Sequence, residues 1–352
     1  MAFLQYSDIG IRAVAACVPK NIVPNSALSA ILAPDELKKT MEVIGIREKR
    51  YADKDVCASD LCFKAAEQLM RDNATDRGTV DALIFLSQTP DYHQPATAPS
   101  LAHRLGLSTT TLSFDVNLAC SGYVYGLSIA FAFAANPGVR KVLFLTGETM
   151  SKTISQKDKV TAPLFGDAGS ATLVEKGDFG TSTFSLNSDG SRAGILNMPY
   201  GGYRHPSSPE GFVEAIDAEG NVRNGEQLKM DGMDVFNFGI RSVPSDVQNL
   251  LKHLGKTVAD VDVLLYHQAN RFMTDFFSKH LRLDTAKTPY CLERFGNTSS
   301  ASIPLTIVSE MADSARYPQR ENVIMTGFGA GLSWGSVFTG LTACRISPLV
   351  EY

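Results

Sequence analysis

The stretch Val80-Asp-Ala-Leu-Ile-Phe85 recurs in the second half of the chain as Val261-Asp-Val-Leu-Leu-Tyr266. Both stretches are short apolar runs, which is typical of strands that are buried on both faces. The second copy starts 181 residues after the first (261 − 80 = 181) in a chain of 352 residues. This spacing predicts that one α/β unit has been duplicated.

Two further pairs of segments keep nearly the same spacing. Asn117-Leu-Ala-Cys-Ser-Gly122 is echoed by Asn297-Thr-Ser-Ser-Ala-Ser302, at an offset of 297 − 117 = 180. Val142-Leu-Phe-Leu-Thr-Gly147 is echoed by Val323-Ile-Met-Thr-Gly327, at an offset of 323 − 142 = 181. Each half therefore predicts the order strand, helix, strand, small-residue loop, buried helix, strand, and hence a parallel or mixed sheet covered by helices. A chance resemblance is the alternative, because buried strands use few residue types.

The mostly apolar composition of residues 120–135 and 300–312 predicts two central helices that are buried between sheets. Between the halves, residues 199–211 are rich in turn-forming residues, and Asp217-Ala-Glu-Gly-Asn221 predicts a hairpin. This insertion either covers a pocket or is a plain surface excursion. Phe165-Gly-Asp-Ala-Gly-Ser-Ala171 is interpreted as a structural turn that enters a strand.

The composition is that of an ordinary globular protein, with 44% hydrophobic and 20% charged residues. The net charge of −4 provides no overall positive field for nucleic acid or an anionic membrane. No signal peptide is recognisable, and no window reaches the roughly 18 apolar residues of a membrane span. Six cysteines without a CxxC pair predict reduced thiols in the cytoplasm and no metal site.

Cys120 follows the strand-like segment 112–116 and precedes Ser121 and Gly122, so it is expected at a strand-to-helix junction. A helix N-terminus favours thiolate over thiol, which predicts a pKa below the reference value of about 8.5. The alternative is a buried structural cysteine, since free cysteine is among the most buried residue types.

His267 follows the second copy of the first strand, and Asn297 stands at the junction that corresponds to Cys120. Taken singly, they could be a core histidine and a helix N-cap. The duplication changes this interpretation, because equivalent ends of two pseudo-symmetric units can converge on one site. A thiol nucleophile with two donors for a carbonyl oxygen is what acyl-thioester chemistry requires.

The glycine-rich segment Gly327-Phe-Gly-Ala-Gly-Leu-Ser-Trp-Gly335 follows another predicted strand. It matches no phosphate-binding pattern and contains no lysine. We therefore expect a close approach of its backbone to a substrate oxygen, with N–H groups as oxyanion donors.

Taken together, these segments resemble the β-ketoacyl-acyl carrier protein synthase III family. The motifs that carry the resemblance are Asp115–Tyr123, Leu164–Ala171, His267–Asn270, Gly296–Pro304 and Gly327–Gly335, with weaker similarity at Asn25–Leu28 and Gly45–Arg50. The resemblance runs nearly end to end. It implies an α/β thiolase fold in which two pseudo-repeated halves, residues 1–176 with the cysteine and 177–352 with the histidine and asparagine, form a five-layer αβαβα sandwich. It also implies a homodimer.

The resemblance further implies that Cys120 accepts an acyl group from a thioester and that a malonyl thioester then decarboxylates and attacks it. His267 and Asn297 would donate hydrogen bonds to the enolate formed by decarboxylation. The expected substrates are acyl-coenzyme A and malonyl-acyl carrier protein, with no cofactor and no metal.

The same resemblance assigns roles to the glycine-rich segment. The backbone N–H groups of Cys120 and Ala330 would hold the oxyanion of the tetrahedral intermediates. Phe328 would supply apolar surface that disfavours the malonyl carboxylate, and Gly329 would complete this wall of the pocket.

The chain departs from the family pattern around the expected coenzyme. The family places a tryptophan and an arginine about the adenine of coenzyme A, whereas this chain has Lys39 near the first position and Lys159 at the second. Two ammonium groups cannot sandwich a base in that way. We expect a different acyl donor or weak binding of coenzyme A. Gln94 replaces a phenylalanine that often reaches into the partner subunit, which predicts a more polar or longer acyl pocket.

For an acidic carrier protein, the predicted helix after His267 offers Arg271, Lys279 and Arg282 as a basic patch. A solvated helix face is the alternative. Phe272 and Asn237 stand where family members often have basic residues, so docking is expected to differ.

Three other functions compete with condensation. The cysteine could pass its acyl group to an oxygen or nitrogen acceptor or to water, making an ester, an amide or an acid. The chain could be a non-catalytic scaffold subunit, because fold alone does not prove activity. Papain-like proteases share the order Cys, His, Asn, but their local signatures are absent.

Overall fold

The structure is a computed structural model that describes residues 2–352. The longer strands are β1 (Phe3–Val18), β4 (Val80–Leu86), β5 (Leu112–Val116), β6 (Lys141–Thr149), β7 (Asp167–Ser188), β12 (Val263–Tyr266), β13 (Val323–Gly329) and β14 (Ser333–Thr339). Short strands are β2 (Ile22–Pro24), β3 (Glu48–Arg50), β8 (Leu196–Asn197), β9 (Ala215–Ile216), β10 (Val222–Arg223), β11 (Lys229–Met230), β15 (Arg345–Ile346) and β16 (Val350–Glu351). The α-helices are α1 (Pro34–Ile44), α2 (Ala58–Asp72), α3 (Thr97–Arg104), α4 (Gly122–Ala134), α5 (Gly232–His253), α6 (Arg271–Leu281), α7 (Leu292–Phe295) and α8 (Ser302–Glu310).

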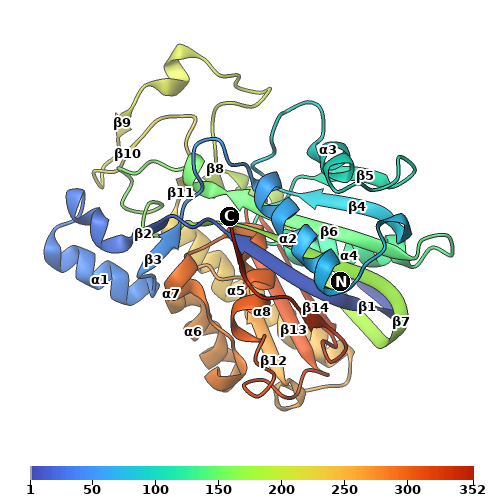
Figure 1. Cartoon of the computed structure of the whole chain (residues 1–352). Coiled ribbons are helices and arrows are strands. Elements are labelled where there is room, and N and C mark those ends of the chain that lie inside the picture. Colours follow the sequence, from blue (N-terminus) through green and yellow to red (C-terminus); the bar gives the residue numbers. More distant parts are fainter. Residues whose placement is uncertain (1) are drawn as a thin grey trace.

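The strands of both halves are connected through β7, in the order β12-β13-β14-β7-β6-β4-β5. The first part of β7 pairs with β6 and its last part with β14, while β1 runs antiparallel to β7 along nearly its whole length (Figure 1). The pairing of β1 with β7 shifts between Ser7 and Ile9, where Asp8 has a φ of 58°. The two halves therefore share two long strands that are irregular where one half passes into the other.

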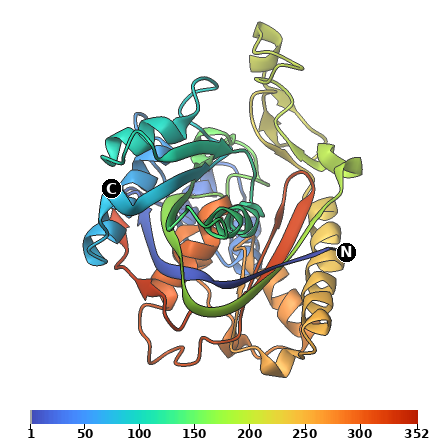
Figure 2. The same ribbon diagram turned by 90° about the vertical axis from the view of Figure 1, so that its right-hand side faces the viewer.

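Side chains that alternate along the strands build the layers. On β4, Ile84 packs in a central core with α4 and α8, whereas Phe85 packs outward against α2 and α3. On β12, Leu265 joins the same central core, and Tyr266 packs outward against α5 and α6. Two helices between strands, with two helical layers outside, give the five-layer αβαβα sandwich that was expected, and Figure 2 shows the helices inside the curved strands.

The two central helices were predicted correctly in kind, but they are shorter than expected. α4 begins at Gly122 and α8 at Ser302, and most residues of both helices are buried. The second half also lacks one predicted strand. Between α6 and α8, residues 282–301 form turns, two short 3-10 helices and α7 instead, and Pro289 in this stretch has no N–H group to contribute to a ladder.

The insertion forms the predicted hairpin, with Val222 opposite Ile216. β9 and β10 stand out from the body of the molecule in both overall views (Figures 1 and 2). The division of the chain at residues 176 and 177 stays a prediction, and β7 runs through this point without a break. In residues 2–352, no helix combines the length and the apolar character that crossing a membrane requires.

Candidate active site

Cys120, His267 and Asn297 line one cavity of about 190 Å³. Cys120 comes from the β5–α4 junction, His267 from the end of β12, and Asn297 from the loop after α7. The rest of the wall is mainly apolar, and its larger side chains are Ile44, Leu164, Phe165, Leu196, Met230, Val235, Phe236, Met273 and Phe328. The structure therefore brings together the three side chains that the sequence singled out, in a cavity suited to a short, uncharged acyl thioester.

Cys120 lies two residues before α4 and is 7% exposed. β13 passes directly over it, and a Cβ atom at Gly329 would come within 2.7 Å of the Cβ atom of Cys120. A Cβ atom at Gly327 would similarly meet the Cys120 carbonyl oxygen at 3.0 Å. The backbone of the glycine-rich segment thus comes close to Cys120, whereas we expected it to approach a substrate oxygen. The role of Ala330 as an oxyanion donor stays a prediction.

The thiol of Cys120 differs from the expectation. Burial raises its pKa to about 12, and the negative charge of Glu148 also raises it, while a hydrogen bond with Ser299 acts in the opposite direction. The prediction of a lowered pKa was wrong. The strand β13 closes over the sulfur, and the resulting burial raises the pKa by more than the helix terminus lowers it. Cys120 is therefore a neutral thiol at pH 7 in the free protein.

This raised pKa predicts how Cys120 reacts with iodoacetamide. Below its pKa of about 12, the thiolate fraction rises about tenfold for each pH unit. We expect the alkylation rate of the Cys120 peptide, followed by mass spectrometry, to rise steadily from pH 6 to pH 10. A plateau beginning below pH 8 would contradict the burial effect.

His267 is a neutral hydrogen-bonding group in this site. Burial lowers its pKa to about 3, although a hydrogen bond to the backbone of Ser299 acts in the opposite direction. The hydroxyl of Ser302 lies 2.7 Å from Nδ1 and also accepts from the N–H of Gln268, which fixes the ring. The Phe328 ring stands edge-on to the imidazole at 5.4 Å between centroids. At neutral pH the site contains no preformed thiolate–imidazolium pair.

Asn297 is held by the Phe165–Ala171 turn. Its backbone N–H donates to the Leu164 carbonyl at 2.8 Å, and its carbonyl accepts from the Gly166 N–H at 3.0 Å. Its side-chain Oδ1 accepts from the N–H of Ser299 at 2.9 Å. This last bond assigns the oxygen, so Nδ2 is the amide atom left as a donor. The turn interpreted as structural therefore positions the asparagine.

Gly166 is a point where this positioning can be tested. A Cβ atom there would lie 2.1 Å from the carbonyl oxygen of Phe295, so the backbone would have to move. We expect Gly166→Ala to destabilise the protein by about 1–3 kcal/mol and to lower the condensation rate. Urea unfolding and product formation measure the two effects. The matched control is Gly138→Ala, because nothing lies within 4 Å of that position. Equal stability of the two variants would contradict the assigned role.

Sequence reasoning missed Glu148, which is fully buried next to the site. Burial raises its pKa to about 7. Its carboxylate accepts hydrogen bonds from the Thr89 hydroxyl at 3.0 Å and from the Ser300 hydroxyl at 3.1 Å. It thereby connects the first half of the chain to the turn that follows Asn297. Only its place in the apolar strand β6 could have marked it in the sequence.

The other predicted contact residues divide into two groups. Lys159 lines the cavity and lies 3.6 Å from Glu36, and Phe328 and Gly329 line it as expected. Lys39 and Gln94 are exposed and do not line it. On α1 it is Thr40 and Ile44 that line the cavity, and a contact of Lys39 with the acyl donor stays a prediction. Gln94 does not shape the cavity within a single chain.

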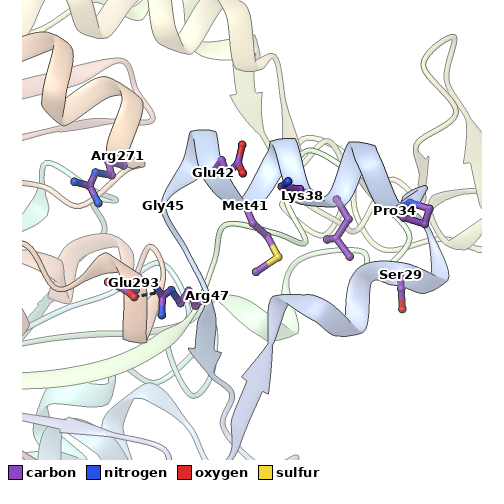
Figure 3. Close-up of a pocket in the computed structure, with 10 residues that line it drawn as sticks. Ser29, Pro34, Lys38, Met41, Glu42, Gly45, Arg47, Arg271 and Glu293 are labelled. Atoms are coloured by element: carbon purple, nitrogen blue, oxygen red, sulfur yellow. Dashed lines mark ion pairs between the residues drawn. The ribbon is translucent and has the colours of Figure 1, made fainter.

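The docking candidates do not line the cavity of Cys120. Arg271 instead lines a neighbouring cavity of about 640 Å³, together with Lys38 of α1 and the Arg47–Glu293 ion pair (Figure 3). Lys279 is exposed in the last turn of α6, about 12 Å along the helix from Arg271, and the exposed Arg282 follows directly after the helix. Basic side chains thus mark both ends of α6.

Comparison with known proteins identifies the family. A family model described as 3-oxoacyl-[acyl-carrier-protein] synthase III matches residues 114–190, and one described as its C-terminal part matches residues 251–340. A putative 3-oxoacyl-[acyl-carrier-protein] synthase 3 of Campylobacter jejuni is 34% identical over 94% of both chains. A β-ketoacyl-[acyl-carrier-protein] synthase III of Desulfitobacterium hafniense is 34% identical over 94% of this chain and 96% of its own.

Solved structures agree with this assignment. The crystal structure of a 3-oxoacyl-(acyl-carrier protein) synthase from Burkholderia xenovorans superposes with a TM-score of 0.92 at 35% identity, covering 100% of this chain and 99% of that chain. The priming β-ketosynthase of the R1128 polyketide pathway superposes with a TM-score of 0.81 at 27% identity, covering 97% and 98%. The chain therefore belongs to the 3-oxoacyl-[acyl-carrier-protein] synthase III family of acyl-transferring condensing enzymes.

Proposed function

We propose that this enzyme joins an acyl group carried on Cys120 to a malonyl thioester, with loss of carbon dioxide. The observation that carries the proposal is the convergence of Cys120, His267 and Asn297 on one apolar cavity. In the first step the sulfur of Cys120 attacks the thioester carbonyl of the donor. The bond from that carbonyl to the donor sulfur breaks, and the thiol proton leaves with the donor as a free thiol.

In the second step a malonyl thioester enters the same cavity. Its carbon–carboxylate bond breaks, carbon dioxide leaves, and the electron pair forms an enolate. The enolate carbon attacks the acyl group on Cys120, and the sulfur departs and takes up a proton. The products are a 3-oxoacyl thioester, carbon dioxide and the free thiol. The two thioesters supply both reacting carbons, so the proposed reaction requires no resident metal or cofactor.

His267 and Asn297 stabilise the enolate oxygen in this proposal. Nδ2 of Asn297 is a donor, and a neutral imidazole supplies a donor without a charge that would retain the malonyl carboxylate. Phe328, packed against the imidazole, makes the surroundings of that carboxylate apolar. An apolar environment disfavours the charged reactant more than the uncharged carbon dioxide product.

The donor is proposed to be a thioester whose binding does not depend on stacking of an adenine. Lys159 at the cavity is already paired with Glu36, and neither it nor the exposed Lys39 offers a planar group. We expect a carrier-protein thioester to acylate Cys120 with a lower KM than acetyl-coenzyme A does. A KM for acetyl-coenzyme A equal to or below that of the carrier thioester would contradict this.

The remaining proposals concern the setting of the reaction. Arg271, Lys279 and Arg282 are proposed to receive an acidic carrier protein along α6, and two chains are proposed to form a homodimer. A cytoplasmic location is proposed because all six cysteines are free thiols.

The decisive assay supplies an acyl thioester and malonyl-acyl carrier protein together. We expect a 3-oxoacyl product and one carbon dioxide for each product molecule. The background rate comes from the Cys120→Ala enzyme. If the product were an ester, an amide or a free acid and no carbon dioxide were released, the reaction would be simple acyl transfer and not condensation.

A further inference from the structure

Ser299 touches all three residues of the proposed site. Its hydroxyl lies 3.5 Å from the sulfur of Cys120. Its backbone N–H donates to Oδ1 of Asn297 at 2.9 Å, and its backbone lies close enough to the His267 imidazole to influence its pKa. The side chain is only 2% exposed. In residues 2–352, no other side chain forms a hydrogen bond with this sulfur.

We propose that Ser299 is a fourth catalytic residue, whose hydroxyl donates a hydrogen bond to the sulfur of Cys120 whenever that sulfur carries negative charge. The proposal deepens the proposed function and rests on it. The sulfur gains negative charge twice in the cycle, once as it attacks the donor thioester and once as it leaves the new 3-oxoacyl product. One fixed donor beside it serves both steps.

The backbone conformation of Ser299 supports a specific contact between its hydroxyl and the sulfur of Cys120. Its φ of 51° lies in the left-handed region, which a serine seldom adopts. The conformation is held by the bond from its N–H to Asn297 and by the N–H of Ser302, which donates to the Ser299 carbonyl. Such conformations persist where the surroundings fix them, and they concentrate at active sites. Here the unusual backbone brings the hydroxyl to the sulfur.

The chemistry of the thiol explains why a donor is needed. Burial leaves Cys120 as a neutral thiol, and the equally buried His267 is not a cation that could pair with a thiolate. The nearby carboxylate of Glu148 also disfavours negative charge on the sulfur. A hydroxyl that donates to the developing thiolate compensates for part of the cost of placing negative charge on this buried sulfur, because hydrogen bonds to charged groups are stronger than those between neutral groups. The proton that leaves the sulfur still ends on the departing donor thiol.

The test separates the hydroxyl from the backbone. Ser299→Ala removes the hydroxyl and keeps the left-handed strain, whereas Ser299→Gly removes both the hydroxyl and the strain. We expect both variants to acylate Cys120 about 100-fold more slowly than the parent enzyme, as after loss of one oxyanion donor. Their iodoacetamide alkylation of Cys120 at pH 8 should fall about tenfold, because the thiolate loses a donor. Normal rates in Ser299→Gly would assign the effect to the backbone and overturn the proposal.

Ser300→Ala is the matched control. Ser300 lies in the same turn, but its hydroxyl donates to Glu148 and does not contact the sulfur. We expect this variant to lose much less alkylation than the two Ser299 variants, and an equal loss in Ser300→Ala would show that loosening of the turn is responsible. The alkylation assay needs no thioester substrate, so it tests the contact of Ser299 with the sulfur even if the enzyme accepts no acyl donor. Failure of the parent enzyme to acylate Cys120 would instead count against the proposed function.

Discussion

Replacing Cys120 by alanine is expected to lower the rate of 3-oxoacyl product formation by about 10⁴-fold to 10⁶-fold, as for other covalent catalysts that lose their nucleophile. Without the sulfur the cavity loses the nucleophile to which the acyl group is transferred in the proposed mechanism. The substitution should leave the fold intact, because alanine is smaller and the sulfur makes a single side-chain hydrogen bond among the described residues. Product formation is followed by mass spectrometry and folding by thermal unfolding.

Cys344→Ala is the control for this substitution. Cys344 follows β14 near the C-terminus and does not line the cavity of Cys120. We expect its activity to match that of the parent enzyme. If Cys120→Ala retained activity within about tenfold of the parent, the covalent mechanism would have to be abandoned, because loss of a nucleophile has a much larger effect.

Asn297→Ala is expected to lower the condensation rate by about 10² to 10³-fold, while acylation of Cys120 falls much less. The reason is that the Nδ2 donor is assigned to the enolate, which forms only after the acyl group has been loaded. Single-turnover experiments separate the two steps, with acyl-enzyme formation and carbon dioxide release measured independently. Asn136→Ala makes the same change at an exposed position at the end of α4 and should have no effect.

His267→Ala should show the same separation of the two steps, since both donors are assigned to one oxygen. Removing both is expected to cost little more than removing one, because residues that act as a unit are not additive. His103→Ala, at an exposed position on α3, is the matched control. Equal losses in acylation and condensation would contradict the assignment of these donors to the enolate.

The sequence was informative where a single segment determines the outcome. The apolar repeats at residues 80–85 and 261–266 predicted buried strands, and both became strands with side chains in an inner and an outer core. The positions of Cys120 and Asn297 at corresponding junctions predicted that they would meet, and both line one cavity. This prediction was possible because the two halves are pseudo-symmetric, so that corresponding junctions lie near each other.

What the sequence did not reveal depends on distant segments meeting. The thiol of Cys120 is buried by β13, about 200 residues later in the chain, and this burial outweighs the helix terminus next to it. Ser299 and Glu148 gain their importance only from partners in other elements. Lys39 does not line the cavity, because adjacent helical residues point about 100° apart and the cavity face of α1 is formed by Thr40 and Ile44.

Mass spectrometry of Cys120 after exposure to acyl thioesters tests the central claim most directly. The account predicts that one acyl group is attached to the Cys120 peptide, and that malonyl thioester removes it with release of one carbon dioxide for each adduct. Formation of 3-oxoacyl product without any acyl group on Cys120, or with the acyl group on another cysteine, would contradict the account.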